Sequence, residues 1–213
     1  MFRILYFAVI LLACKGGASE PAPSAATGEL LPSPAAPKHG ELPEVVAGRN
    51  LVKLADGRAV LGPFSMRVPA DWKETPSESN MRVAEFKLPG PAGTQAEVIV
   101  YYFGEGGAGS IDANVDRWVS QFKQPDGKPS REVTKIEKAS FAGQEATLVS
   151  LAGRYVAAPP GGGEAVDKPD QSLLAAIVPS PRGPYYFRLI GDQAAVTEQA
   201  PRFREALTSL ALQ

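Results

Sequence analysis

The sequence is poor in the side chains that most often bind metals or attack substrates. Its 213 residues include one cysteine, Cys14, and one histidine, His39. One cysteine excludes an intramolecular disulfide, and so few cysteines and histidines exclude zinc sites of the usual types. Both residues lie near the N-terminus, which leaves no thiol nucleophile and no serine–histidine–aspartate arrangement for the rest of the chain. We therefore expect no metal and no cofactor.

Neither sign of charge is in excess. The chain has 22 Lys and Arg against 23 Asp and Glu, which gives a net charge of -1. A neutral balance provides no field that would attract the phosphates of a nucleic acid. We expect a protein that does not bind nucleic acid.

The N-terminus has the order of a secretory signal. A short positive start, Met1–Arg3, precedes ten apolar residues, Ile4–Ala13, and then a small, polar stretch. Ten residues are too few to cross a hydrocarbon core of about 30 Å as a helix. We therefore expect this segment to be processed rather than to span a membrane. Two alternatives to the lipid anchor described next are an uncleaved anchor and a plain secretory signal that is cut elsewhere.

The end of the apolar run, Leu11-Leu12-Ala13-Cys14, resembles the lipobox of bacterial lipoproteins, although Leu12 stands where that family usually has Ala, Ser or Thr. The resemblance implies that residues 1–13 are removed and that Cys14 is acylated, which would anchor the chain in a membrane. Lys15 stands where, in enteric lipoproteins, an Asp signals retention in the inner membrane. The resemblance therefore favours the outer membrane, facing the periplasm.

Residues 14–44 are rich in Pro, Ala, Ser and Gly, with prolines at 21, 23, 32, 34, 37 and 43. Such a segment has too little apolar surface to offset the entropy of ordering, and we expect an extended spacer of about 3 Å per residue. His39 lies in this spacer and is expected to be solvated. Residues 45–213 are then a single domain.

Alternating and continuous apolar runs predict seven strands in this domain. They cover residues 64–68, 81–88, 95–103, 132–138, 144–156, 173–178 and 185–190. The lead-in 45–61 would form a hairpin that turns at Asp56-Gly57, and Ala142-Gly143 would join two strands in another hairpin. Residues 157–170, with their Pro and Gly cluster, are expected to be a loop.

Two apolar stripes predict helices. Apolar residues spaced as on one helical face follow Ser110, a suitable N-cap, and Pro125-Asp126-Gly127 would stop the helix: Ile111, Val115, Trp118, Val119 and Phe122. The second stripe comprises Val196, Ala200, Phe203, Leu207 and Leu210. Proline fits only the first turn of a helix, so Pro201 predicts a start near Gln199 or Ala200.

The order of elements predicts an α+β fold, an antiparallel sheet of about seven strands flanked by two helices. The segment 64–72, which ends in Pro69-Ala70-Asp71-Trp72, resembles the opening strand and turn of the PsbP-type α/β/α sandwich, and Leu207–Leu210 resembles its ending. That likeness covers about residues 62–213, and it implies an assembly factor, a protein-binding module or a lipoprotein.

A second resemblance is to uncharacterised bacterial lipoproteins, and it implies no known reaction. It rests on Met81-Arg82, Ala84, Phe86, Phe103-Gly104, Ala113-Asn114, Arg117-Trp118 and Gln121-Phe122.

The glycine-rich stretch Gly104–Gly109 matches the dinucleotide fingerprint formally, since it follows a strand and opens a helix. The fingerprint also needs a parallel strand ending in an acidic residue about twenty positions on, where this chain has a turn and then an antiparallel hairpin. We expect a glycine hinge or lid, and no nucleotide.

Candidate binding residues lie on the first helix. Asn114, Arg117 and Gln121 recur on one face beside Trp118, and could form a polar row that holds a carboxylate or the backbone of a partner. The alternative is that Arg117 pairs locally with Asp112 or Asp116, while the two amides satisfy loop backbone. Trp72 and Trp118 are expected in the core.

Two classes of function stay open. The first is a non-enzymatic binding or assembly module whose partner is an envelope protein or polymer. The second is a carboxylate-dependent hydrolase, or another enzyme of the envelope acting on a small ligand, for which residue types alone offer Glu85, Glu97, Glu105, Asp112 and Asp116. Clustered carboxyls with raised pKa values in a closed cleft would favour the enzyme. An exposed aromatic or apolar patch would favour the binding module.

Overall fold

The computed structural model describes residues 51–77, 79–158 and 165–213, which belong to one compact unit, Gly40–Gln213. Cys14, the signal segment 1–13 and the spacer 14–44 lie outside the described residues, as does the start of the lead-in. None of the described helices has the length and apolarity needed to span a bilayer.

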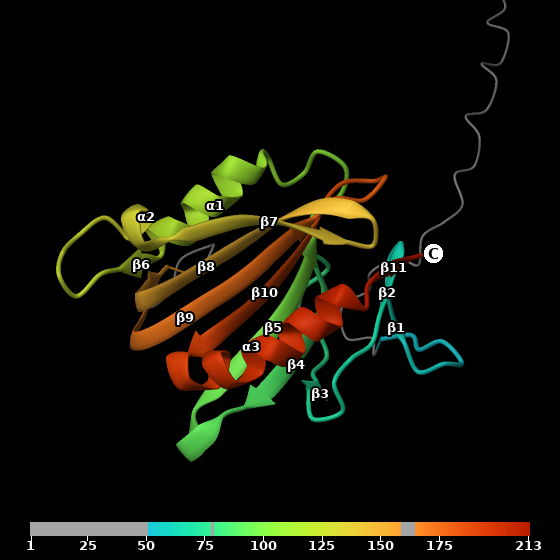
Figure 1. Cartoon of the computed structure of the whole chain (residues 1–213), viewed down its shortest axis with the longest axis horizontal. Coiled ribbons are helices and arrows are strands. Elements are labelled where there is room, and N and C mark those ends of the chain that lie inside the picture. The colour runs from blue at the N-terminus through green and yellow to red at the C-terminus, as the bar shows by residue number, and fades with distance from the viewer. Residues whose placement is uncertain (1–50, 78, 159–164) are drawn as a thin grey trace, which may run out of the picture. The chain divides into compact units, whose positions relative to one another are not determined.

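Most strands of the described residues belong to one antiparallel sheet with the order β3-β4-β5-β10-β9-β8-β6, in which β7 also pairs with β8 (Figure 1). These strands are β3 (Lys73–Glu74), β4 (Arg82–Pro89), β5 (Gln95–Tyr102), β6 (Phe122–Lys123), β7 (Lys135–Phe141), β8 (Gln144–Ala157), β9 (Val166–Val178) and β10 (Tyr185–Asp192). The α+β class and the size of the sheet confirm the prediction. The expected hairpin at Ala142-Gly143 is present, with left-handed φ angles of 51° and 74°.

Each face of the sheet packs against one helix. Along β10 the side chains alternate, so that Phe187 faces the cluster with α3 (Gln193–Thr208) and Tyr186 faces the cluster with α1 (Ile111–Ser120). Figure 1 shows α3 lying across one face of the sheet. Trp72 and Trp118 are 6% and 3% exposed, one in each cluster, so the prediction that both are core residues is confirmed.

Helix α1 is capped as expected but ends earlier than expected. The Ser110 side chain accepts a hydrogen bond from the Ala113 backbone N–H. The helix stops at Ser120 because Phe122 leaves it to pair with Tyr155 as β6, and the Gln121 carbonyl accepts a bond from Val156. A short helix, α2 (Ser130–Val133), then precedes β7, which begins three residues later than predicted.

The predicted start of the last helix is wrong, because α3 begins at Gln193 and holds Pro201 in its interior. Its first turn is set by packing: a Cβ on Gly90 would lie 2.4 Å from the Cβ of Ala195, so the two segments are in close contact. Pro201 is exposed, and it removes one hydrogen bond at a cost of about 3 kcal/mol. Burial of Val196 and its neighbours against the sheet outweighs that cost.

The predicted loop at 157–170 is too long, since β9 already begins at Val166. Its first residues pair with β8, as in Tyr155 with Lys168, and Arg154 binds the Asp167 carboxylate through two hydrogen bonds. Pro169 is tolerated because the pairing register shifts there, as at a β-bulge, and Asp170 has a positive φ of 48°. Residues 159–164 lie outside the described part.

The strand predicted at 64–68 is shorter and belongs to a second sheet of order β1-β2-β11, made of β1 (Ala59–Leu61), β2 (Phe64–Met66) and β11 (Ala211–Leu212). The expected hairpin at Asp56-Gly57 leads into it, with Lys53 paired to Ala59. Arg58 donates hydrogen bonds to Ser65 and to the Ser209 carbonyl, which fastens this small sheet to the end of α3. A short 3-10 helix, η1 (Pro91–Gly93), connects β4 and β5.

Candidate functional site

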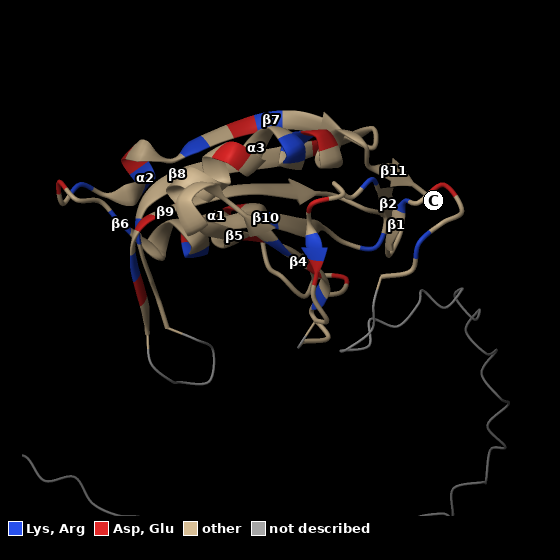
Figure 2. Ribbon diagram, turned by 90° about the horizontal axis from the view of Figure 1, so that it is seen from below, with Lys and Arg blue, Asp and Glu red and all other residues tan. Residues whose placement is uncertain are grey.

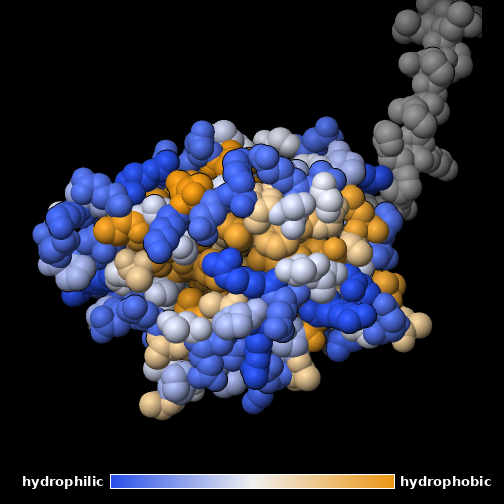
Figure 3. Space-filling view, viewed as in Figure 1, coloured by the Kyte–Doolittle hydropathy of each residue, from blue (hydrophilic) through white to orange (hydrophobic). Residues whose placement is uncertain are grey.

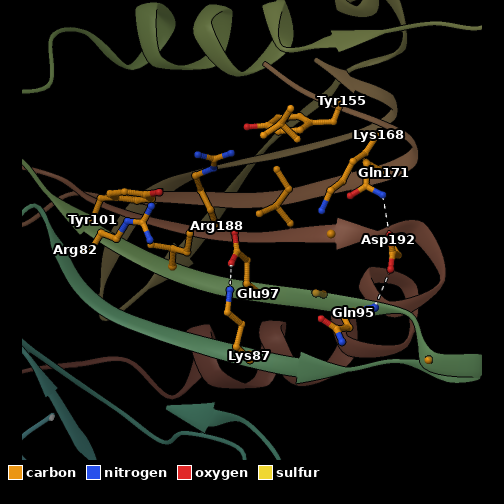
Figure 4. A pocket seen from close by; sticks show the side chains of 16 residues that line it. Arg82, Lys87, Gln95, Glu97, Tyr101, Tyr155, Lys168, Gln171, Arg188 and Asp192 are labelled. Carbon is orange, nitrogen blue, oxygen red and sulfur yellow. Dashed lines mark hydrogen bonds and ion pairs between the residues drawn. The ribbon is translucent and has the colours of Figure 1, made fainter. Parts of the chain in front are cut away.

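An open groove of about 450 Å³ lies on the α1 face of the large sheet (Figure 4). It exists because α1, with ten residues, extends only about 15 Å and packs on β8, β9 and β10. The side of β4 and β5 is left uncovered. Figure 4 shows side chains from these strands and from β8 to β10 around the groove, among them Arg82, Glu97, Tyr101, Tyr155, Arg188 and Asp192.

Ion pairs run across β4 and β5 at one side of the groove. Lys87 stands opposite Glu97 in the register, and its ammonium lies 2.6 Å from the Glu97 carboxylate. This hydrogen bond raises the pKa of Lys87. The buried Glu85 carboxylate binds Arg82 at 2.6 Å. The pKa of Arg82 is raised, because the bond to Glu85 and the nearby negative groups outweigh the opposing effect of burial.

Arg188 lies in the middle of the groove, next to Ile99 in the register of β10 and β5. Its Nε atom is buried and has no hydrogen-bond partner among the described residues. The guanidinium carbon lies 5.9 Å from the ring centroid of Trp118, so α1 supplies an aromatic ring for a cation–π contact. Among the described residues, Arg188 is thus contacted by an aromatic ring and not by a counter-ion.

Asp192 closes the groove at the end of β10. Its carboxylate accepts hydrogen bonds from Gln171 Nε2 at 2.8 Å and from the backbone N–H of Gln95 at 2.9 Å. These two bonds lower the pKa of Asp192. A carboxyl held in the ionised form is a poor proton donor at neutral pH. The other groove carboxylate, Glu97, is ion-paired with Lys87.

The residues predicted from sequence on α1 do not form one exposed row. Asn114 is 1% exposed, and its amide donates to the carbonyls of Ala108 and Ser110. Arg117 is exposed and donates to Asn114 Oδ1 rather than to Asp112 or Asp116. Asn114 therefore satisfies loop backbone, as one of the alternatives expected. The binding role of these residues stays a prediction.

Trp118 and Gln121, the other two candidates on α1, have surroundings that differ from those of Asn114 and Arg117. Trp118 is buried and is not part of the groove lining, but its ring contacts Arg188, which is. The Gln121 Oε1 atom is buried without a hydrogen-bond partner among the described residues. Among the four candidate binding residues of α1, Trp118 thus has a contact with a residue of the groove, Arg188.

The glycine-rich stretch forms a turn between β5 and α1, with positive φ angles at Gly104, Gly106 and Gly109. The strand that follows α1 is β6, which is antiparallel to β8. This connection differs from the βαβ unit that carries a dinucleotide fingerprint. Nucleotide binding was not expected, and that expectation stays a prediction.

Sequence reasoning missed the groove and its central Arg188. A signal was present, because Arg188 is the single charged residue in the otherwise apolar run Tyr185–Ile190. A lone cation in a strand that is buried on both faces requires a partner or a polar opening. The register that sets Arg188 beside Ile99 was not readable from the sequence.

A second groove, of about 510 Å³, lies on the opposite face between α3 and β7. Figure 3 shows apolar surface in the middle of this face, and Val133, Val196 and Ala200 line the groove. Acidic and basic residues are interspersed on the ribbon, as along β7 in Figure 2. Within the described ranges, no cluster of three or more His, Cys, Asp and Glu side chains is placed to hold a metal.

No family model matches the sequence, and no curated protein matches it. Among solved structures, the chain is similar to PsbP (CyanoP) from Synechocystis sp. PCC 6803, with 11% identity, a TM-score of 0.41, and 84% of this chain and 100% of that chain covered. It is also similar to PA94 from Pseudomonas aeruginosa, a protein of unknown function titled a putative regulator, with 15% identity, a TM-score of 0.40, and 77% and 96% covered.

LpqN from Mycobacterium tuberculosis, which is involved in cell envelope biogenesis, is a further similar structure. The identity is 13% and the TM-score is 0.39, with 70% of this chain and 83% of that chain covered.

Proposed function

We propose that the protein is a lipoprotein of the bacterial cell envelope that holds a non-enzymatic binding module outside the cytoplasm. The anchor is supported by the order of positive start, short apolar run, sole cysteine and Pro-rich spacer in residues 1–44. Several acyl chains on Cys14 would give stable attachment, because each buried CH₂ contributes about 0.8 kcal/mol. Lys15 favours the outer membrane, with the module facing the periplasm.

Replacing the cysteine tests the anchor. We expect Cys14→Ser to move the protein from the membrane pellet to the soluble extracytoplasmic fraction, because the mature chain would lose its acyl chains. Fractionation followed by immunoblotting measures this, and Ser19→Ala is a control that should stay in the membrane. A Cys14→Ser protein that remains membrane-bound, or a wild-type mass without diacylglycerol, would contradict the proposal.

The groove on the α1 face carries the binding part of the proposal. It is open, of the size that ligand sites occupy, and lined by the half-buried rings of Tyr101 and Tyr155 together with charged groups. The carboxylates Glu97 and Asp192 are engaged by neighbouring groups, as described above. This combination supports recognition of an envelope protein or polymer rather than a hydrolytic reaction.

Hydroxyl-radical footprinting tests this role without assuming a ligand. The full-length protein in detergent micelles is oxidised with and without a solubilised envelope extract from cells that lack it. We expect the extract to lower oxidation of Tyr101 and Tyr155 several-fold, because a bound ligand shields their rings. Leu212, exposed on β11 and remote from the groove lining, is the internal control. Unchanged oxidation of both tyrosines would reject the groove as the binding site.

A further inference from the structure

Arg188 differs from the two groove cations on β4, Arg82 and Lys87. Arg82 is paired with Glu85, and Lys87 with Glu97, both at 2.6 Å. The ion pairs within the described part of the chain do not include Arg188. With its Nε buried and unsatisfied, the guanidinium carries its charge into the groove without a partner from these residues.

A buried donor without an acceptor is costly, and the cost is larger for a charged group. Proteins therefore keep few such donors, and one at the centre of an open groove is a functional candidate. We propose that Arg188 is the anchor for an oxyanion, a carboxylate or a phosphate, on a small ligand or chain end that enters the groove. This inference rests on the proposed function, because it identifies the chemical group that the binding groove recognises.

The surroundings of Arg188 match this chemistry. The planar guanidinium presents donors in a fork that fits two oxygens of a carboxylate or phosphate. The guanidinium carbon lies 5.9 Å from the centroid of the Trp118 ring, and this cation–π contact helps to hold the side chain in the groove. Lys168, exposed at the rim of the groove, adds a second positive charge, while the nearby Asp192 is occupied by Gln171 and Gln95.

The walls define the rest of the ligand. Ile99, Tyr101 and Tyr155 are apolar or aromatic and lie beside Arg188 in the lining of the groove. Tyr101 is itself braced by stacking on Phe103 at 5.8 Å between ring centroids. A ligand that carries an apolar or planar portion next to its oxyanion would fill these contacts.

The test uses small probes that carry each oxyanion on a planar group. Benzoate and phenyl phosphate are titrated into full-length protein in micelles, and the indole N–H signal of Trp118 is followed by NMR. Trp72, the second of two tryptophans, lies in the other core cluster and is the internal reference. We expect saturable shifts of the Trp118 signal with one or both anions, and none with neutral benzamide. The responding anion then distinguishes carboxylate from phosphate.

Variants assign the binding to Arg188. Arg188→Gln should weaken the responding anion at least about tenfold, because a charge-assisted double hydrogen bond is lost. Arg188→Lys should retain part of the affinity, and it decides the question if the glutamine variant does not fold. Lys138→Gln removes a cation of β7 outside the groove lining and should have no effect. Equal binding of benzamide, no shift with either anion, or unchanged affinity in the Arg188 variants would overturn the inference.

The footprint separates this inference from the proposed function. If envelope extract still protects Tyr101 and Tyr155 in Arg188→Gln, the groove binds a ligand but Arg188 does not recognise it. If the extract protects neither ring in the wild type, the proposed function itself fails.

Discussion

Trp72→Ala is expected to lower the free energy of unfolding by about 3–5 kcal/mol, among the largest effects of any substitution in this chain. The indole lies where α3 meets the large sheet, 5.6 Å from the Phe86 ring and 6.5 Å from the Phe203 ring. Its removal would leave a cavity between rigid elements that cannot close around it. Urea unfolding followed by far-UV circular dichroism measures the loss.

Trp72→Phe separates packing from hydrogen bonding at the same site. The Trp72 indole N–H donates to Gln199 Oε1 at 3.1 Å, and Gln199 is 1% exposed. Phenylalanine would keep most of the ring contacts but leave that oxygen buried without its donor, which costs about 1–3 kcal/mol. We expect Trp72→Phe to lie between wild type and Trp72→Ala. A wild-type stability for Trp72→Ala would mean that the turn after β2 does not secure α3.

Gly191→Ala is expected to destabilise the protein by about 2–4 kcal/mol, from backbone strain together with overpacking. Gly191 has a φ of 154°, and a Cβ there would lie 2.4 Å from the Gln95 carbonyl oxygen and 2.5 Å from the Ala96 Cα. These are backbone atoms of the paired strand β5, so β5 and β10 would have to separate. Because this pairing forms the end of the groove, footprinting should also show increased exposure of the groove.

Gly57→Ala is the matched control. Gly57 also has a positive φ, 80°, but nothing lies within 4 Å of the position that its Cβ would take. The strain alone should cost about 1 kcal/mol. If the two alanine variants lose equal stability in the same urea experiment, close approach of the strands at Gly191 is not what requires glycine.

The fold could be predicted to the extent that its signals are local. Ser110 and the apolar stripe that follows it specify α1, since an N-cap and helical spacing act within a few residues. Ala142-Gly143 specifies a tight hairpin because its two residues must adopt left-handed φ angles. The continuous apolar run before Phe103 specifies a strand, and β5 lies inside the sheet, between β4 and β10.

Predictions failed where distant contacts override local preference. Pro201 predicted a late start for α3, whereas burial of Val196 and contact with Gly90 begin the helix at Gln193. Pro169 predicted a loop, whereas pairing with β8 extends β9 across it. In both cases the local cost of a proline is smaller than the apolar burial or strand pairing that the rest of the chain provides.

The candidate site was the least predictable part. The sequence pattern predicted candidate binding residues on one face of a recognisable helix: Asn114, Arg117, Gln121 and Trp118. Trp118 does contact Arg188 of the groove, but it is buried outside the groove lining, and the Asn114 amide donates to the backbone of its own loop. The groove forms because α1 leaves β4 and β5 uncovered. The position of a helix over a sheet depends on the whole domain, and no pattern within a single segment predicts it.

The sequence by itself determined the α+β class, the main strands, the capped start of α1 and a terminal segment that predicts a lipid anchor. These follow from periodicity, turn chemistry and composition, all of which act over a few residues. Only the tertiary structure decided that Arg188 contacts Trp118 and lines one groove together with Tyr101 and Tyr155. Strand order and register bring these residues together from four separate segments, and both are fixed by the packing of the whole domain.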